Sequence, residues 1–299
     1  MPHAKANGLD IYYESHGDTD ADPILLIMGL GAQMTRWSPD FIGKLVAAGH
    51  RVIAFDNRDV GLTEKLDAAG APDMGAVVQA LAEKRKPPVA YTLDDMAADA
   101  AGLLEALGIE RAHIVGASMG GMIAQLVAAD HPERTLSLTS IMSTTGNPDL
   151  PRARPEAMAR LNTPAPDPRQ DLDAYLTSAV EGAKVMAGTY PVNEALVREQ
   201  SLNDFHRSYY PVGFQRQYAG IMASPDRRPK LATITAPTVV IHGADDPLVP
   251  VEGGRDTADN IPGADLRIIP GVGHEMPAAT QDAFIAGILS AVARSKVGA

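Results

Sequence analysis

The chain has 299 residues, which is enough to bury the core of one α/β domain that also carries an insertion. It holds 26 Lys and Arg against 37 Asp and Glu, and this formal net charge of −11 argues against nucleic acid and anionic membranes as partners. Cysteine is absent, which excludes disulfides, cysteine metal sites and a cysteine nucleophile. No secretory signal follows Met1 and no apolar run has the length of a membrane span, so we expect a cytoplasmic protein.

The first third of the chain alternates short apolar runs with helical patterns. Thr92, a good N-cap with Asp95 three residues later, predicts the start of a helix that ends before Gly108. Strands that alternate with helices in this way predict right-handed crossovers and a mostly parallel sheet. The predicted strands are 10–14 (in an antiparallel edge hairpin), 24–28 and 52–55, and the predicted earlier helices are 41–48 and a short one at 74–84.

The motif at 116–120 has the form Gly-x-Ser-x-Gly and centres on Ser118. The apolar run 112–115 predicts a buried strand before it, and residues 121–129 predict a helix after it. A serine in this setting is typical of a nucleophile elbow, a turn so sharp that a side chain at either glycine would collide with its neighbours. The motif alone fits an ordinary strand-to-helix turn equally well, so the argument depends on the rest of the site.

The composition changes after Thr145. Six prolines between 146 and 168 predict a linker. Three helical patterns follow, at 172–186, 192–209 and 214–222. We expect residues 146–230 to form a helical cap, or lid, inserted between two parts of an α/β core at 1–145 and 231–299. The alternative is a helical insertion with no part in catalysis.

A carboxylate and a histidine complete the candidate site. Residues 238–241 predict a buried strand followed by Asp245 and Asp246, and residues 266–269 predict a strand followed by a glycine-rich loop with His274. A serine hydroxyl needs an imidazole to accept its proton, and the imidazole needs a carboxylate to fix its tautomer. We prefer Asp246 for this role, because an acidic residue such as Asp245 often only bonds its own turn. The alternative for His274 is a loop histidine that caps a carbonyl.

Residues 23–31 predict a strand that runs into a glycine-containing loop. We expect two backbone N–H groups, of Leu30 in this loop and of Met119 after the serine, to hold a substrate's carbonyl oxygen. Arg58 and Asp59 follow another strand, and we expect them to fix a loop by pairing rather than to contact substrate. Four large apolar residues near strand ends either line an acyl pocket or pack in the core: Met28, Trp37, Met142 and Met276.

The chain order Ser118, Asp246, His274 resembles that of the α/β-hydrolase superfamily. With the strand-and-loop pieces around these residues, the resemblance extends over nearly the full length. It implies the α/β-hydrolase fold, with a mostly parallel central sheet flanked by helices and an inserted helical cap.

A closer resemblance rests on two departures from the common family pattern. Many members have His-Gly at the loop where this chain has Met28-Gly29, and many have Asp-x-Arg-Gly-x-Gly-x-Ser where residues 56–63 carry Asp59 and Thr63 instead of glycine and serine. Both departures resemble the branch that contains the aclacinomycin methylesterase. That branch implies cleavage of a carboxylic ester.

The motifs and the resemblance together predict a serine hydrolase that cleaves a small-molecule carboxylic ester through an acyl-enzyme, with no cofactor and no metal. Carbon–carbon bond hydrolysis of a dienone-type substrate and lactone opening are alternatives on the same three residues. A ligand receptor with slow turnover is an alternative from another class. Serine at position 118 disfavours a dehalogenase or epoxide hydrolase, because those relatives have aspartate there.

Overall fold

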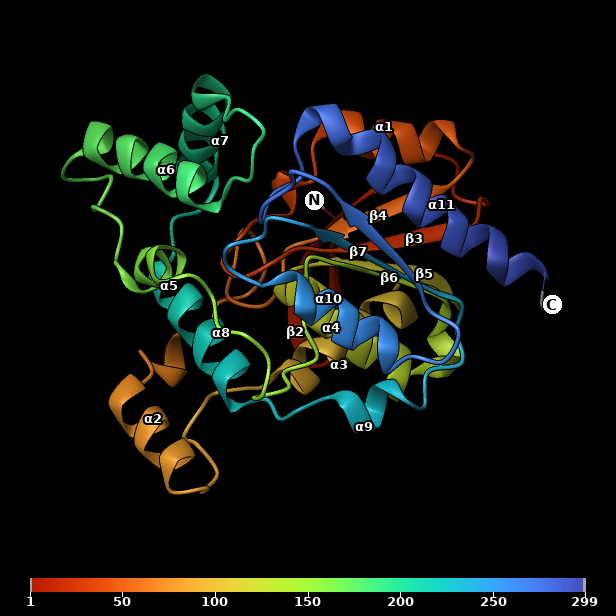
Figure 1. The fold of residues 1–299 in the computed structure, drawn as a ribbon, viewed down its shortest axis with the longest axis horizontal. Coiled ribbons are helices and arrows are strands. Elements are labelled where there is room, and N and C mark those ends of the chain that lie inside the picture. The colour runs from red at the N-terminus through yellow and green to blue at the C-terminus, as the bar shows by residue number, and fades with distance from the viewer. Residues whose placement is uncertain (1, 298–299) are drawn as a thin grey trace.

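The computed structural model describes residues 2–297, and eight strands form one sheet through its centre (Figure 1). The strand order is β1-β2-β4-β3-β5-β6-β7-β8. The pairs β1–β2 and β2–β4 are antiparallel and the other pairs are parallel, which confirms the predicted edge hairpin and mostly parallel sheet. The strands are His3–Ala6 (β1), Leu9–His16 (β2), Pro23–Ile27 (β3), Arg51–Phe55 (β4), Ala112–Ala117 (β5), Thr135–Ile141 (β6), Thr238–Gly243 (β7) and Asp265–Ile269 (β8).

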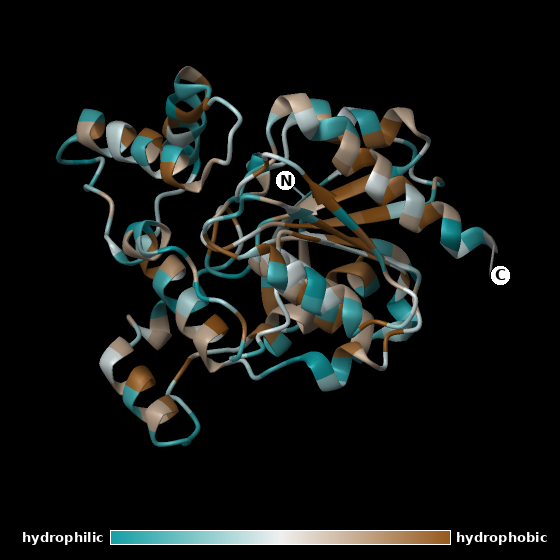
Figure 2. Ribbon diagram, viewed as in Figure 1, coloured by the Kyte–Doolittle hydropathy of each residue, from teal (hydrophilic) through white to brown (hydrophobic). Residues whose placement is uncertain are grey.

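Helices cover both faces of the sheet, as Figure 1 shows. α1 (Pro39–Ala47) and α11 (Gln281–Val297) lie over one face, and α3 (Leu93–Ala106), α4 (Met119–Asp130) and α10 (Val251–Asp259) lie over the other. The central strands are hydrophobic along their length (Figure 2), because each of their faces packs against a helix layer. This two-sided core holds the carboxyl ends of the parallel strands rigidly at one edge.

The predicted start and end of α3 are confirmed. The Thr92 backbone N–H donates to Asp95 Oδ2 at 2.8 Å, as the capping pattern requires. The helix ends just before Gly108, which takes a φ of +67° that is costly for other residues.

Residues 146–230, called here the inserted segment, carry four helices beside the sheet and a short one, α9 (Arg228–Leu231), at its end. The predicted linker at 146–168 is wrong in part, because α5 (Pro155–Asn162) lies within it. Pro155 stands in the first turn of α5, where a missing N–H costs nothing. The other helices are α6 (Leu172–Met186), α7 (Glu194–Arg207) and α8 (Pro211–Ala223), and α8 packs against α2 (Met74–Ala82). The division of the chain into a core and a cap stays a prediction.

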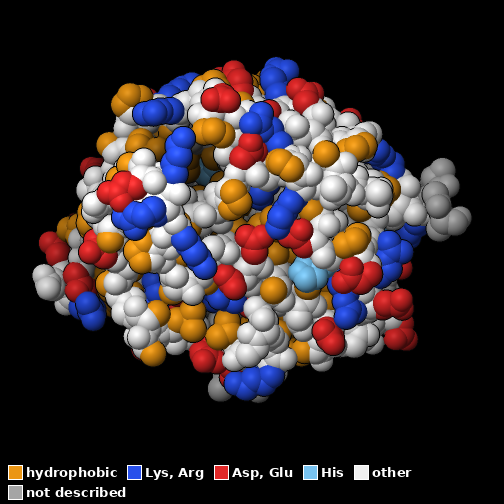
Figure 3. Space-filling model, turned by 90° about the horizontal axis from the view of Figure 1, so that it is seen from below, with side chains coloured by type: hydrophobic (Ala, Val, Ile, Leu, Met, Phe, Trp, Pro, Cys, Tyr) orange, Lys and Arg blue, Asp and Glu red, His pale blue; other side chains and the backbone are white. Residues whose placement is uncertain are grey.

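The surface is mixed in charge. Figure 3 shows acidic and basic side chains interspersed across one face, with hydrophobic side chains in small groups between them. Within residues 2–297, every helix is too short or too polar to cross a membrane.

His113 on β5 makes stability depend on pH. Its side chain is buried, and burial together with nearby His50 lowers its pKa from 6.5 to about 4. The unfolded chain therefore binds more protons between pH 6.5 and pH 4, and stability falls as the pH falls through this window. We expect the free energy of unfolding to drop by roughly 2 kcal/mol from this residue between pH 7 and pH 5.

Urea unfolding at the two pH values measures this drop. The His113→Gln variant should lose about 2 kcal/mol less than the wild type over the same interval, whatever its stability at pH 7. Equal losses in the two proteins would show that His113 does not titrate in this window.

Candidate active site

The sharp turn between β5 and α4 presents Ser118. Its φ is +57°, a strained value for a residue with a side chain, and it stands at the N-cap of α4. A Cβ at Gly116 would lie 2.0 Å from the Gly120 carbonyl oxygen, and a Cβ at Gly120 would lie 2.1 Å from the Ile27 carbonyl oxygen. The predicted steric need for both glycines of the motif is therefore confirmed.

The end of β6 and the residues just after it hold this turn in place. The Ser118 N–H donates to the Ile141 carbonyl at 2.9 Å, and the Ser143 hydroxyl donates to the Ser118 carbonyl at 2.9 Å. A Cβ at Gly121 would lie 2.6 Å from that of Ser143, so the two segments are in close contact. Ser143 is a supporting residue that no sequence motif indicated.

Ser118, His274 and Asp246 form one chain of hydrogen bonds. His274 Nε2 lies 2.9 Å from Ser118 Oγ, and His274 Nδ1 lies 2.8 Å from Asp246 Oδ2. Both distances are in the range for proton transfer between a nucleophile, a base and the group that orients the base. The Asp246 side chain is buried, and that of His274 is 11% exposed.

The Asp246 carboxylate is fixed by its own turn. Asp246 Oδ1 accepts the backbone N–H groups of Leu248 and Val249, at 2.9 and 2.8 Å, which leaves Oδ2 for His274. Behind it, His242 Nε2 bonds the Val249 carbonyl at 2.8 Å, and burial lowers the pKa of His242. Of the two adjacent aspartates, Asp246 is the one that contacts His274.

The loop that carries His274, residues 270–277, is bonded to the inserted segment. The His274 N–H donates to the Met186 carbonyl at 2.8 Å, and the Gly188 N–H donates to Glu275 Oε1 at 3.2 Å. Burial raises the pKa of Glu275 against the effect of this hydrogen bond. The link between α6 and α7 therefore helps to hold the histidine loop.

The loop after β3, residues 28–33 and called here the β3 loop, lies beside the serine. A Cβ at Gly29 would be 3.1 Å from Ser118 Cβ, and Asn57 Nδ2 holds the Met28 carbonyl at 2.9 Å. Within residues 2–297, the backbone N–H groups of Leu30 and Met119 donate to no protein acceptor. An oxyanion hole requires unpaired N–H groups of this kind, and the assignment of these two to one stays a prediction.

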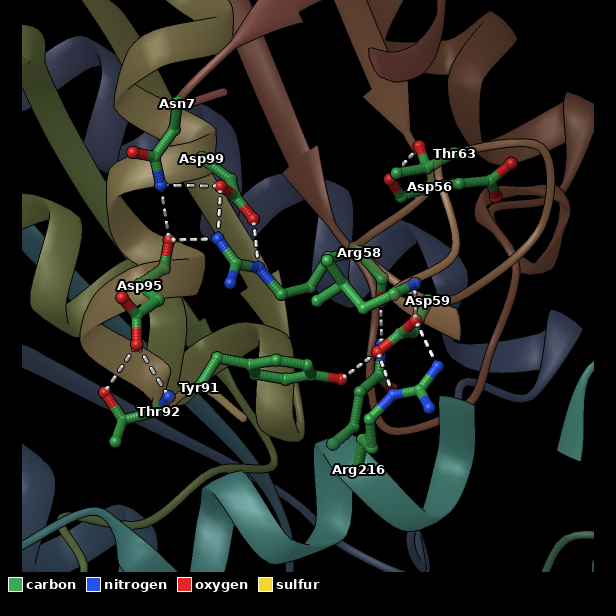
Figure 4. A network of polar contacts seen from close by, with 12 residues as sticks. Asn7, Asp56, Arg58, Asp59, Thr63, Tyr91, Thr92, Asp95, Asp99 and Arg216 are labelled. Atoms are coloured by element: carbon green, nitrogen blue, oxygen red, sulfur yellow. Dashed lines mark hydrogen bonds and ion pairs between the residues drawn. The ribbon is translucent and has the colours of Figure 1, made fainter. Parts of the chain in front are cut away.

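Buried ion pairs hold the next loop (Figure 4). Arg58 bonds Asp99 at 2.6 Å, and Asp59 bonds Arg216 of α8 at 2.7 and 2.8 Å and the Tyr91 hydroxyl at 2.8 Å. Burial acts to raise the pKa of Asp59, but these hydrogen bonds outweigh it and lower the pKa. The expected role in fixing a loop agrees with this network, but each residue pairs with a distant helix and not with its neighbour.

A cavity of about 430 Å³ lies between the β3 loop and the inserted segment. Leu30 and Gly31 form part of its wall, whereas Ser118 and His274 do not line it. Aromatic side chains of α6, of α7, of the residues between α7 and α8, and of α8 form much of the opposite wall: Tyr175, Phe205, Tyr209, Tyr210 and Phe214.

The four apolar candidates lie outside this cavity. Met28, Trp37 and Met142 are buried in the core cluster between the sheet, α1 and α11, and Met276 packs against that cluster while half-buried. Trp37 also lines a separate cavity of about 430 Å³, near Val46. Their role in an acyl pocket stays a prediction.

Among residues 2–297, no three His, Asp and Glu side chains are grouped so as to hold a metal ion. The residues that converge on Ser118 are instead a histidine, a carboxylate and backbone N–H groups, which is a set suited to acyl transfer.

Comparisons with known proteins agree with the fold and with the predicted branch. The chain is 30% identical to rhodomycin D methylesterase DauP of Streptomyces sp. (strain C5) over 93% of each chain, and 29% identical to rhodomycin D methylesterase DnrP of Streptomyces peucetius with the same coverage. The meta-cleavage product hydrolase CumD of Pseudomonas fluorescens IP01 shares the fold, with a TM-score of 0.74 at 19% identity over 99% of this chain and 98% of that one. The model of the alpha/beta hydrolase fold family matches residues 22–277. The chain therefore belongs to the α/β hydrolase fold family, and its resemblance to the methylesterase branch is confirmed.

Proposed function

We propose that this protein is a serine hydrolase that cleaves a carboxylic ester through an acyl-enzyme. The observation that carries the proposal is the unbroken chain of hydrogen bonds from Ser118 Oγ through His274 to Asp246, beside two free backbone N–H groups. Because DauP and DnrP are named as methylesterases, methyl esters of carboxylic acids are the first class of substrate to assay.

In the first half of the reaction, Ser118 Oγ attacks the ester carbonyl carbon while His274 Nε2 takes the hydroxyl proton. The carbonyl oxygen becomes an oxyanion, which the N–H groups of Leu30 and Met119 stabilise. The carbon–oxygen bond to the leaving alcohol then breaks, and His274 returns its proton to the alcohol. An acyl group remains on Ser118.

In the second half, His274 takes a proton from water as the water attacks the acyl carbon. Collapse of the second tetrahedral intermediate releases the carboxylic acid and restores the Ser118 hydroxyl. Asp246 keeps the proton of His274 on Nδ1 throughout, so that Nε2 is free to accept and return a proton.

We further propose that the inserted segment is a cap. It supplies α6, α7 and the start of α8 to the cavity wall above the β3 loop, and it is bonded to the histidine loop. A cap in this position would exclude water from the reacting ester and shape the space for the acyl or alcohol group.

Hydrolysis of p-nitrophenyl acetate and butyrate tests the proposal, together with labelling by a fluorophosphonate. We expect a pre-steady-state burst of nitrophenol and a mass increase on Ser118, and neither should occur in Ser118→Ala. Turnover that survives in Ser118→Ala would contradict the assignment of the nucleophile. Labelling without ester turnover would contradict the ester hydrolase and favour the carbon–carbon hydrolase or the receptor.

A further inference from the structure

One side chain of the inserted segment bonds directly to the β3 loop. Gln217 of α8 is fully buried, and its Oε1 accepts the Gly31 N–H at 2.8 Å. Its Nε2 donates to the Arg58 carbonyl at 2.8 Å. Both ends of the amide are therefore used, and a flipped amide would set a donor against the Gly31 N–H and an acceptor against the Arg58 carbonyl.

The bonded N–H is one peptide away from the N–H that we assign to the oxyanion hole. Peptide units are planar, so only φ and ψ of Leu30 separate the Gly31 peptide from the peptide that carries the Leu30 N–H. The loop is also confined on both sides. A Cβ at Gly29 would lie 3.1 Å from Ser118 Cβ, and a Cβ at Gly31 would lie 2.7 Å from Phe214 Cδ2 of α8.

Helix α8 is itself held firmly to the core. The guanidinium of Arg216 forms two hydrogen bonds with the Asp59 carboxylate, and both side chains are almost completely buried (Figure 4). A Cβ at Gly213 would lie 2.0 Å from the Asp59 carbonyl oxygen, so the backbones of α8 and the Asp59 loop touch. Breaking a buried pair of this kind is strongly unfavourable, so α8 is a fixed support.

We infer that Gln217 is a positioning residue for the reaction: from the inserted segment, it sets the orientation of the Leu30 N–H toward the oxyanion. This inference rests on the proposed function and deepens it. The inserted segment is then part of the catalytic apparatus, because the core supplies the β3 loop and α8 fixes the orientation of the Leu30 N–H in that loop. Gln217 does this without touching the substrate.

The Gln217→Met variant keeps the length of the side chain and removes both hydrogen bonds. We expect kcat for p-nitrophenyl butyrate to fall roughly 10²-fold while KM changes less than about twofold, because loss of an oxyanion donor acts on the transition state. Gln215→Met is the matched control, since Gln215 is an exposed glutamine on the same helix, and its kcat should stay within about twofold of wild type.

A second variant separates positioning from packing. In Gln217→Glu, burial favours the protonated carboxyl, which offers the same acceptor to Gly31 and the same donor to Arg58. We expect it to recover at least tenfold of the kcat lost in Gln217→Met. If Gln217→Met fails to fold, Gln217→Glu is compared with Gln217→Ala instead. Equal kcat values in these two variants, both folded, would overturn the inference.

The inhibition constant of an aryl trifluoromethyl ketone distinguishes loss of oxyanion stabilisation from a change in packing alone. The ketone forms a hemiketal oxyanion on Ser118, so across the Gln217 variants its inhibition constant should rise by the same factor as kcat/KM falls. A Gln217→Met enzyme with wild-type kcat and wild-type inhibition overturns the inference alone. A wild-type protein with no Ser118-dependent turnover overturns the proposed function, and the inference falls with it.

Discussion

Asp246→Asn is expected to lower kcat for p-nitrophenyl ester hydrolysis by about 10⁴-fold with little change in KM. The backbone N–H groups of Leu248 and Val249 bond Asp246 Oδ1, so in the variant they select the amide oxygen for that position. The amide nitrogen is left to face His274 Nδ1. It can only donate there, which forces the imidazole proton onto Nε2, and Nε2 can then no longer accept the proton of Ser118.

Asp245→Asn is the matched control, because it makes the same chemical change one residue away. The Asp245 side chain is half-buried, and within residues 2–297 it forms no hydrogen bond or ion pair. We expect its kcat to stay within about twofold of wild type. Equal losses in the two variants, or a larger loss in Asp245→Asn, would reassign the carboxylate that orients His274.

The residues around Ser118 could be predicted from local patterns because each stands in a short strand–turn unit. Parallel strands end at the same edge of a sheet, so residues that follow β5, β7 and β8 must approach one another there. The hydrogen bonds of Ser118, His274 and Asp246 agree with that expectation. The preference for Asp246 over Asp245 rested on turn chemistry alone, and it remains for the variants to test.

Strand β6 was not predicted, for a physical reason. Four of its seven residues carry hydroxyl groups, a composition typical of an exposed polar segment. All four are nevertheless buried. Residues outside the strand bond three of these hydroxyls. Ser137 Oγ bonds His113 at 2.8 Å, Ser140 Oγ accepts from Gln125 Nε2 at 3.1 Å, and Thr135 Oγ1 donates to the His131 carbonyl at 3.3 Å. Tertiary partners of this kind leave no trace in the local sequence.

The contacts of the inserted segment with the β3 loop and the histidine loop could also not be predicted from the sequence. Gly31 and Gln217 are 186 residues apart, and a buried glutamine on a helix has no pattern that names its partner. The same holds for Gly188, which lies in the link between α6 and α7 and donates its N–H to Glu275 of the histidine loop. Only the fold shows that helices far along the chain touch both loops beside Ser118.

Gly188→Ala is expected to lower kcat at least about 10²-fold, since displacement of a reacting group by about 1 Å has that effect. A Cβ at Gly188 would lie 2.1 Å from the Gly271 carbonyl oxygen and 2.6 Å from the Gly273 nitrogen. Both contacts are with backbone, which cannot rotate away as a side chain can. Either the histidine loop or the link must therefore shift. His274 is affected by both movements, because its N–H bonds the carbonyl of Met186, the last residue of α6 before the link.

Gly43→Ala is the control, since it adds the same methyl group in α1, where no heavy atom outside the helix lies within 4 Å of the new Cβ. It should keep wild-type kcat and gain up to about 1 kcal/mol of stability, because alanine is the better helix former. The melting temperature and the rate of fluorophosphonate labelling of Ser118 distinguish a displaced histidine from a loss of folding. A folded Gly188→Ala protein with a wild-type labelling rate would show that the histidine loop tolerates the shift, whereas slow labelling of a folded protein would place the link between α6 and α7 among the parts that hold the base.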